Sequence, residues 1–229
     1  MGIRAFAVDA LAKGLGFGRR YGSLMMSKSP ADDVVSIYRE HADAFVRQRG
    51  TGLIERAWLD AFLALLPGAS PRVLEIGCGF GVPIAQYLIE RGCRITGVDT
   101  SVPLLKRAKA AFPEHEWIAA DMRRMAVAGP FDGLIAWPSF FHLSPEDQRG
   151  MFEEFGQLAA PGAVLRFTSG TGLGEAIGEF EGRPLYHGSL EGAEYRELLG
   201  GSGFEVVRYM VEDAGCGGAT VWVANRLGA

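Results

Sequence analysis

The strongest constraint on the fold is an alternation of short apolar runs and helix-like stretches between residues 72 and 169. The apolar runs are RVLEIG, RITGVD, EWIAAD, FDGLIAW and AVLRFTS, and helical periodicity is expected over residues 82–91, 103–112 and 145–160. Consecutive parallel strands need a long crossover, usually a helix. The alternation therefore predicts βαβ units and an α/β fold, with a parallel sheet covered by helices on both faces.

The two ends of the chain depart from this alternation. Helical spacing predicts one helix over Asp32–Arg47 and a second over about Leu53–Leu66, which Pro67-Gly68 ends. Near the C-terminus, a helix around 192–199 precedes FEVVRYMVED and GATVWVANR, which only AGCGG separates. So short a turn predicts an antiparallel pair. We expect a flexible or peripheral extension (1–30), helices that form a lid (31–70) and one domain (71–229).

Composition narrows the classes of partner. The chain has 229 residues, of which 48% are hydrophobic and 22% charged, so it is long and apolar enough for a packed core. Its net charge is −4 and we see no basic stripe, which argues against a nucleic-acid partner. No apolar run reaches the ~18 residues of a membrane span. The 3 Cys and 4 His show neither C-x-x-C nor metal-ligand spacing, so we expect a cytoplasmic protein without a metal. We also expect a monomer or homodimer.

Three consecutive strands are expected to end on or near a carboxylate. The first ends at Glu75-Ile76-Gly77, the second at Asp99 and the third at Asp121. Ligands of open α/β sheets bind outside the carboxyl ends of the strands. These acids, and the glycine-rich loop that runs from Gly77 to Gly81, are therefore expected to surround a ligand.

Two ligands compete for this loop. A dinucleotide site has the spacing G-x-G-x-x-G and an acid about 20 residues further on. Asp99 satisfies the second condition, but the loop reads G-x-G-x-G, and Glu75 would stand near two phosphates. S-adenosylmethionine, by contrast, has ribose and adenine, carries a sulfonium and an ammonium, and lacks phosphate. Asp99 could accept from both ribose hydroxyls, and Asp121 from the adenine amino group, with Met122 beside the ring.

The segments VLEIGCGFG, GVDTS, AADMRRM and FDGLIAWPSFFHL resemble the class I S-adenosylmethionine-dependent methyltransferases that act on small molecules. The resemblance covers about residues 72–226. It implies a seven-stranded Rossmann-like sheet of order 3-2-1-4-5-7-6, with strand 7 antiparallel, and S-adenosylhomocysteine as the product. The cofactor-binding residues that we expect are Glu75, Gly77, Cys78, Gly79, Gly81, Asp99, Thr100, Asp121, Met122 and Trp137.

The acceptor side is expected just past the fourth strand. WPSFFHL supplies aromatic residues that could exclude water and favour a sulfonium, among them Phe140 and Phe141, and the N-terminal helix could add Tyr38. His142 is the candidate general base, because its ordinary pKa of ~6.5 suits proton transfer. The alternative is that His142 only orders the loop or caps the next helix.

A second candidate cluster lies in EGRPLYHGSL, between the fifth strand and the last helix. Arg183, Tyr186 and His187 could form a substrate-binding loop there, because long loops inside compact domains are often functional, or the segment could be a surface crossover. The fourth strand lacks the Asn/Asp-Pro-Pro-Tyr pattern of resembling enzymes that modify nucleic acids or proteins, which favours a small-molecule acceptor. We expect O- or N-methylation, with C-methylation possible; the alternatives are a non-catalytic S-adenosylmethionine-binding module and an NAD(P)-binding oxidoreductase.

Overall fold

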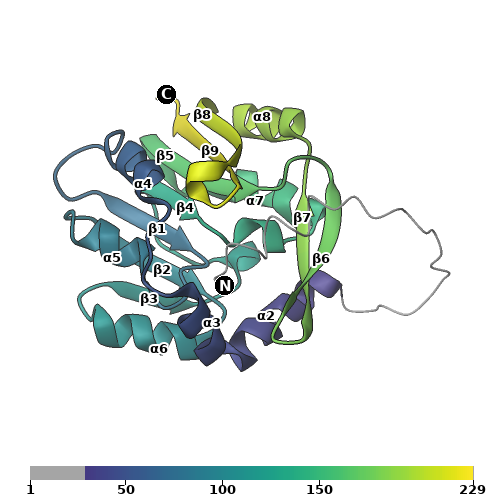
Figure 1. The fold of residues 1–229 in the computed structure, drawn as a ribbon. Coiled ribbons are helices and arrows are strands. Elements are labelled where there is room, and N and C mark those ends of the chain that lie inside the picture. Colours follow the sequence, from purple (N-terminus) through teal and green to yellow (C-terminus); the bar gives the residue numbers. More distant parts are fainter. Residues whose placement is uncertain (1–28, 229) are drawn as a thin grey trace.

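The protein folds around one seven-stranded sheet. In the computed structural model, which describes residues 29–228, the strands lie in the order β3-β2-β1-β4-β5-β9-β8 (Figure 1). The first five are parallel to one another, and β9 is antiparallel to both β5 and β8. The predicted order is confirmed, since β8 and β9 are the sixth and seventh strands expected. The strands of this sheet are β1 (Arg72–Ile76), β2 (Arg94–Asp99), β3 (Glu116–Ala119), β4 (Phe131–Ala136), β5 (Ala159–Ser169), β8 (Phe204–Asp213) and β9 (Ala219–Arg226).

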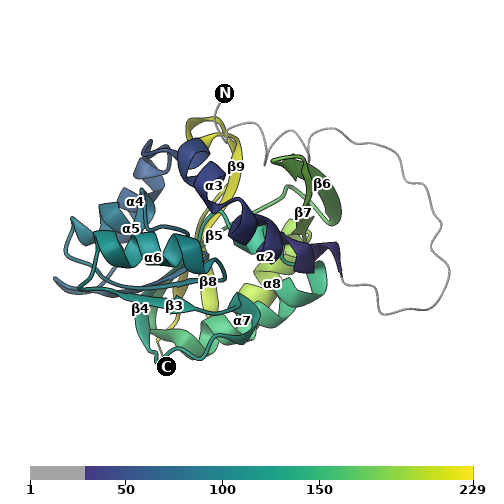
Figure 2. The same ribbon diagram turned by 90° about the horizontal axis from the view of Figure 1, so that it is seen from below.

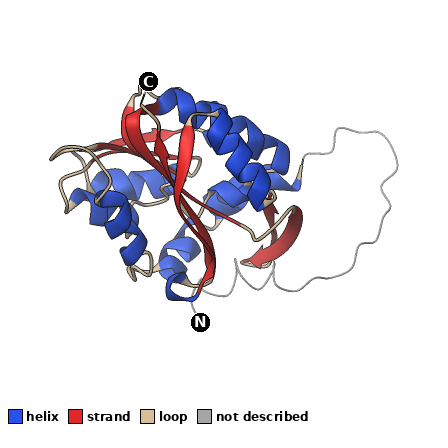
Figure 3. Ribbon diagram, turned by 90° about the horizontal axis from the view of Figure 1, so that it is seen from above, coloured by secondary structure: helices blue, strands red, loops and turns tan. Residues whose placement is uncertain are grey.

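Helices cover both faces of the sheet, as Figures 1 and 3 show. Side chains of a strand alternate between faces, and β1 illustrates the consequence. Val73 packs on one face with α4 and α5, whereas Leu74 and Ile76 pack on the other face with α7 and α8. The helices are α4 (Arg56–Leu63), α5 (Ile84–Ile89), α6 (Val102–Ala111), α7 (Pro145–Leu158) and α8 (Gly192–Gly201).

The predicted N-terminal helix is two helices, α2 (Pro30–Glu40) and α3 (Ala42–Arg49), with a break at His41. Ser29 caps α2, since its hydroxyl accepts a hydrogen bond from the backbone N–H of Ala31. Seen from below, α2 and α3 lie across the carboxyl edge of the sheet (Figure 2), and we call them the lid helices. By contrast, α4 is part of the core, because Leu59 and Phe62 are fully buried against the sheet.

The segment after β5 is a β-hairpin rather than the loop or crossover that the sequence suggested. Strands β6 (Gly174–Phe180) and β7 (Arg183–Ser189) pair antiparallel across a two-residue turn. Both turn residues, Glu181 and Gly182, have positive φ (51° and 75°). Such turns match the twist of the flanking strands. The hairpin packs against α2 through Phe180 and Leu185.

The expected flexible extension, apart from its last residues, lies outside the described residues. Within residues 29–228, no helix has the length and apolar character needed to cross a bilayer.

Candidate active site

The glycine-rich loop is a place where the backbone leaves no room for side chains. Gly77, Gly79 and Gly81 all have positive φ, between 56° and 77°. A Cβ on Gly77 would lie 2.2 Å from the Cβ of Ser139, the residue that follows the end of β4 by three positions. The hydroxyl of Ser139 donates to the backbone oxygen of Ile76 at 2.5 Å. The loop is thus held against the end of β4, at the carboxyl edge of the sheet.

Asp99, at the end of β2, fixes this loop. One carboxylate oxygen accepts from the backbone N–H of Gly79 and the other from that of Ser101, both at 2.8 Å. Burial raises the pKa of Asp99, and the backbone amide hydrogen bonds oppose this rise. The backbone N–H of Thr100 contributes a third bond, and the carboxylate, which offers about four lone-pair sites, retains acceptor capacity. Asp99 can therefore hold the loop and still accept hydrogen bonds from a ligand.

Asp121 is engaged by an arginine from its own turn. Arg123 donates to it from the backbone N–H at 3.0 Å and from the guanidinium at 2.6 Å, and also reaches Asp32 on α2 at 2.8 Å. Burial raises the pKa of Asp121, but the hydrogen bonds from Arg123 outweigh it and leave the pKa below its ordinary value. Asp121 is thus a charged carboxylate tied to the lid.

Glu75 is buried below the loop, with 2% of its surface exposed and one carboxylate oxygen without a hydrogen-bond partner. Burial raises its pKa to about 8; Arg49 lowers it, and Asp99 raises it further. A buried carboxylate without a partner is costly to ionise. Glu75 is therefore largely protonated at neutral pH, and a nearby cation would favour its charged form.

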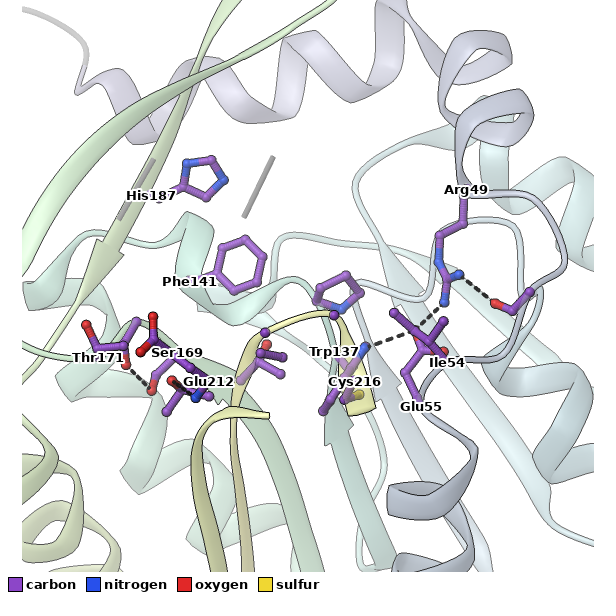
Figure 4. Close-up of a pocket in the computed structure, with 18 of the residues that line it drawn as sticks. Arg49, Ile54, Glu55, Trp137, Phe141, Ser169, Thr171, His187, Glu212 and Cys216 are labelled. Carbon is purple, nitrogen blue, oxygen red and sulfur yellow. Dashed lines mark hydrogen bonds and ion pairs between the residues drawn. The ribbon is translucent and has the colours of Figure 1, made fainter. Parts of the chain in front are cut away.

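Two larger cavities lie on either side of the residues past β4. The first, of about 170 Å³, is bounded by the glycine loop, the ends of β2 and β3 and the lid helices, and we call it the strand-end pocket. The second, of about 450 Å³, lies beside the ends of β5 and β9 and is shown in Figure 4; we call it the aromatic cavity. Both are lined by Arg49, Pro138, Phe141 and His187. These four residues form the junction between the cavities.

His142 joins the lid to the hairpin. Its Nδ1 lies 2.9 Å from the backbone oxygen of Tyr186, which can only accept, so Nδ1 carries the proton. Its Nε2, 3.0 Å from the hydroxyl of Tyr38, therefore accepts from that hydroxyl. Burial, with a further contribution from His187, lowers the pKa of His142 to about 3. Both ring nitrogens are thus occupied in a neutral imidazole, which fits the ordering role better than the role of base.

His187 comes from β7 and lies above Phe141 at the junction (Figure 4). It is 3% exposed, and burial lowers its pKa to about 4. At neutral pH it is an uncharged side chain that borders both cavities, unlike His142, which lines only the strand-end pocket.

The structure brings most of the predicted site residues together. The strand-end pocket is lined by Tyr38, Gly77, Gly79, Asp99, Thr100, Asp121, Met122, Phe141, His142 and His187. A small recess beside it, of about 20 Å³, is lined by Glu75, Cys78 and Trp137 among others. Trp137, expected at the cofactor, lines the aromatic cavity and this recess but not the strand-end pocket.

Four predicted residues line none of these cavities. Phe140 is fully buried in the core between Phe152 and Phe167, because the single turn of 3-10 helix at 140–142 directs it away from the junction. Gly81 packs toward Trp117. Arg183 forms an ion pair with Glu40 at 2.9 Å near the hairpin turn, and the hydroxyl of Tyr186 donates to Glu175. The positions of Phe140, Arg183 and Tyr186 follow from the turn after β4 and from the hairpin, neither of which the sequence analysis contained.

Sequence reasoning missed the far wall of the aromatic cavity. Arg49 and Glu55 form an ion pair at 2.5 Å, and Glu55 also accepts from the indole N–H of Trp137 at 3.2 Å. Thr168 and the segment 216–220 complete the wall. No motif marked these residues, because they come from three elements that are distant in sequence.

Comparisons with known proteins agree with this geometry. Residues 73–162 match the model of a family described as a methyltransferase domain. This segment is a methyltransferase domain. It contains the glycine loop, the strand-end acids and the turn past β4, so the resemblance inferred from the sequence is confirmed for this part of the chain.

Relatives of the methyltransferase domain include enzymes with different named acceptors. The chain is 34% identical over 112 residues to malonyl-[acyl-carrier protein] O-methyltransferase of Salmonella typhimurium, and 42% identical over 95 residues to trans-aconitate 2-methyltransferase of Azoarcus sp.. The matches cover 48% and 41% of this chain, and 43% and 36% of those proteins. The chain thus matches less than half the length of either.

The fold of the methyltransferase domain and its surroundings is also found in solved structures. One is 1,6-didemethyltoxoflavin-N1-methyltransferase of Burkholderia thailandensis, with bound S-adenosylhomocysteine, at a TM-score of 0.69 and 18% identity over 91% of this chain and 93% of that one. A second is magnesium protoporphyrin IX methyltransferase of Synechocystis, with a TM-score of 0.66 and 18% identity over 89% of this chain and 100% of that one. At these identities the likeness concerns the fold.

Proposed function

We propose that this chain is an S-adenosylmethionine-dependent methyltransferase that acts on a small molecule. The observation that carries the proposal is the pair of cavities that share a junction. One is built on the glycine loop and the strand-end acids, and the other is larger and has Trp137, Phe141 and His187 in its wall. A methyltransferase needs this arrangement, because donor and acceptor must meet in line while water is excluded.

The strand-end pocket fits the cofactor in its chemistry. Asp99 keeps lone pairs for ribose hydroxyls, and the loop glycines expose backbone to the ligand. In the small recess beside the pocket, the orphaned carboxylate oxygen of Glu75 would favour a nearby ligand that carries positive charge and no phosphate. When bound, S-adenosylmethionine would supply a methyl group activated by its sulfonium.

The proposal includes a movement of the lid helices that admits the cofactor. The strand-end pocket is about 170 Å³, whereas ligand pockets usually start at roughly 300 Å³. Tyr38 and Phe45 of the lid helices line it, and Tyr38 is held by His142. We assign His142 a positioning role: it anchors Tyr38, and hence the lid, over the junction.

We assign the acceptor to the aromatic cavity, which is lined by Trp137 and, at the junction, by Phe141 and His187. Among the residues that form the junction, His187 is the side chain that could accept a proton. The names of the relatives include acceptors with carboxylates and a ring nitrogen, so O- and N-methylation both remain in the proposal.

The test is isothermal titration of the full chain with S-adenosylhomocysteine and with NADH. We expect S-adenosylhomocysteine to bind and NADH not to bind. Asp99→Ala should weaken the affinity for S-adenosylhomocysteine by about 10- to 100-fold, because a hydrogen bond to a charged group contributes ~1.5–3 kcal/mol. Glu197→Ala, an exposed acid of α8 that lines neither cavity, is the control and should leave the affinity unchanged. Absence of S-adenosylhomocysteine binding would refute the proposal.

A further inference from the structure

The charged side chains that line the aromatic cavity include more acids than bases. Three charged side chains line it: Arg49, Glu55 and Glu212. Arg49 is already paired with Glu55 at 2.5 Å and also donates to the backbone oxygen of Gly52 at 3.2 Å. Glu212 is exposed, and no ion pair involving it lies within 4 Å among residues 29–228. The net charge of the lining side chains is therefore negative.

The next cation in the wall is screened from the cavity. Arg166 of β5 is fully buried, and its guanidinium lies 3.9 Å from the ring of Trp137. Arg166 does not line the cavity, whereas Trp137 does. An anionic ligand would thus meet the indole ring rather than this guanidinium.

Two further nitrogen donors in the lining are used inside the protein, whereas the nitrogens of Arg166, behind Trp137, have no hydrogen-bond partner among the described residues. Besides Arg49, the indole N–H of Trp137 donates to Glu55, and the amide nitrogen of Gln48 donates to Glu181 at 2.6 Å. Among the lining groups of the described residues, the second oxygen of Glu55 and Nδ1 of His187 have no hydrogen-bond partner, and Glu212 forms no ion pair with another residue of 29–228. The hydroxyl of Thr168 is also unpartnered and can donate or accept.

The two acidic groups lie on opposite sides of the aromatic wall. In Figure 4, Glu55 is beside Trp137 and Arg49, whereas Glu212 is on the side of Ser169 and Thr171. A ligand between them would have Trp137 and Phe141 along its body. Aromatic faces attract cations as well as apolar rings, so the wall and the acids favour the same ligand.

We propose that the aromatic cavity receives an amine-bearing acceptor, uncharged or cationic, with a flat apolar body, and that it discriminates against carboxylate acceptors. A carboxylate can only accept hydrogen bonds. It would find the guanidinium of Arg49 already bonded to Gly52 and neutralised by Glu55, and it would also face the carboxylate of Glu212, whose like charge repels it. This inference rests on the proposed function, because it takes the aromatic cavity as the acceptor site.

The test uses two probes with the same ring and opposite charge, tryptamine and indole-3-propionate, and adds trans-aconitate as a tricarboxylate. The full chain is first saturated with S-adenosylhomocysteine, and each probe is then titrated calorimetrically at one ionic strength. We expect tryptamine to bind at least tenfold more tightly than indole-3-propionate and trans-aconitate. Glu212→Gln should reduce the preference for tryptamine by about threefold or more.

The control variant is Glu205→Gln, which removes an exposed acid from the same strand, β8, outside the cavity. It should leave the preference unchanged. Equal or tighter binding of either carboxylate probe would overturn the inference, as would failure of both indoles to bind at millimolar concentration. Because S-adenosylhomocysteine binding is measured first, a failure at that step counts against the proposed function, and a reversed preference after it counts against the acceptor class alone.

Discussion

At Gly77 the loop backbone passes so close to Ser139 that only a hydrogen atom fits on the Cα. An added methyl group would overlap the Ser139 side chain and would also force an alanine to φ +74°. We expect Gly77→Ala to lower the free energy of unfolding by about 2–6 kcal/mol, the sum of a strained backbone and an overpacked contact. Chemical denaturation measures this.

The matched control is Gly150→Ala. Gly150 lies in the middle of α7, is exposed and has open space where a Cβ would go. The same change should therefore stabilise the protein by about 0.4–1 kcal/mol, because it reduces the entropy of the unfolded chain. Equal effects at the two positions would show that the loop is not close-packed against β4.

At the scale of elements, the lid helices and the hairpin β6–β7 form one packed unit over the strand-end pocket. Tyr38 stacks on Phe180 at 5.6 Å, and Arg183 pairs with Glu40. We expect S-adenosylhomocysteine to slow amide hydrogen exchange by about tenfold or more over residues 30–49 and 174–189. The reason is that a ligand under the lid opposes its local opening.

Helix α8 is the internal reference for this exchange experiment. It packs beside α7 on one face of the sheet and lines neither cavity. Its amide exchange should therefore change little when S-adenosylhomocysteine binds. If protection increased in α8 as much as in the lid helices, the ligand would be stabilising the whole fold rather than closing the lid.

For the whole molecule, three buried groups are held neutral in the folded state: Glu75, His142 and His187. Burial raises the pKa of Glu75 to about 8, and lowers those of His142 and His187 to about 3 and 4. In the unfolded chain a Glu titrates near 4.3 and a His near 6.5. Below pH 6.5 the unfolded histidines bind more protons than the folded ones, so stability falls as pH falls. Between about 4.3 and 8 the folded Glu75 binds more protons, so its contribution falls as pH rises.

The two effects predict a maximum of thermal stability near pH 6.5 for the ligand-free protein. Above pH 6.5 the folded state binds about one proton more than the unfolded state, on Glu75. Glu75→Gln removes this difference, so the stability of the variant should not decline as pH rises. At pH 8 this variant should melt about 3 °C or more above the wild type, since one pKa unit corresponds to ~1.4 kcal/mol and 1 kcal/mol to about 2–4 °C in a domain of this size. A constant difference from pH 5 to pH 9 would show that Glu75 is charged throughout.

The sequence by itself determined the sheet and the cofactor side of the site. Strand and helix periodicities are local, and strands that run in parallel end at one edge, so Glu75, Asp99 and Asp121 could be placed together without a structure. Only the tertiary structure decided the acceptor side. The bond between Tyr38 and His142 joins residues 104 positions apart, and the aromatic cavity takes its walls from α3, β5, β7 and β9 together. Which side chains such distant segments bring into contact depends on packing, and no local pattern encodes it. This is why the glycine loop could be predicted and the bond between Trp137 and Glu55, 82 positions apart, could not.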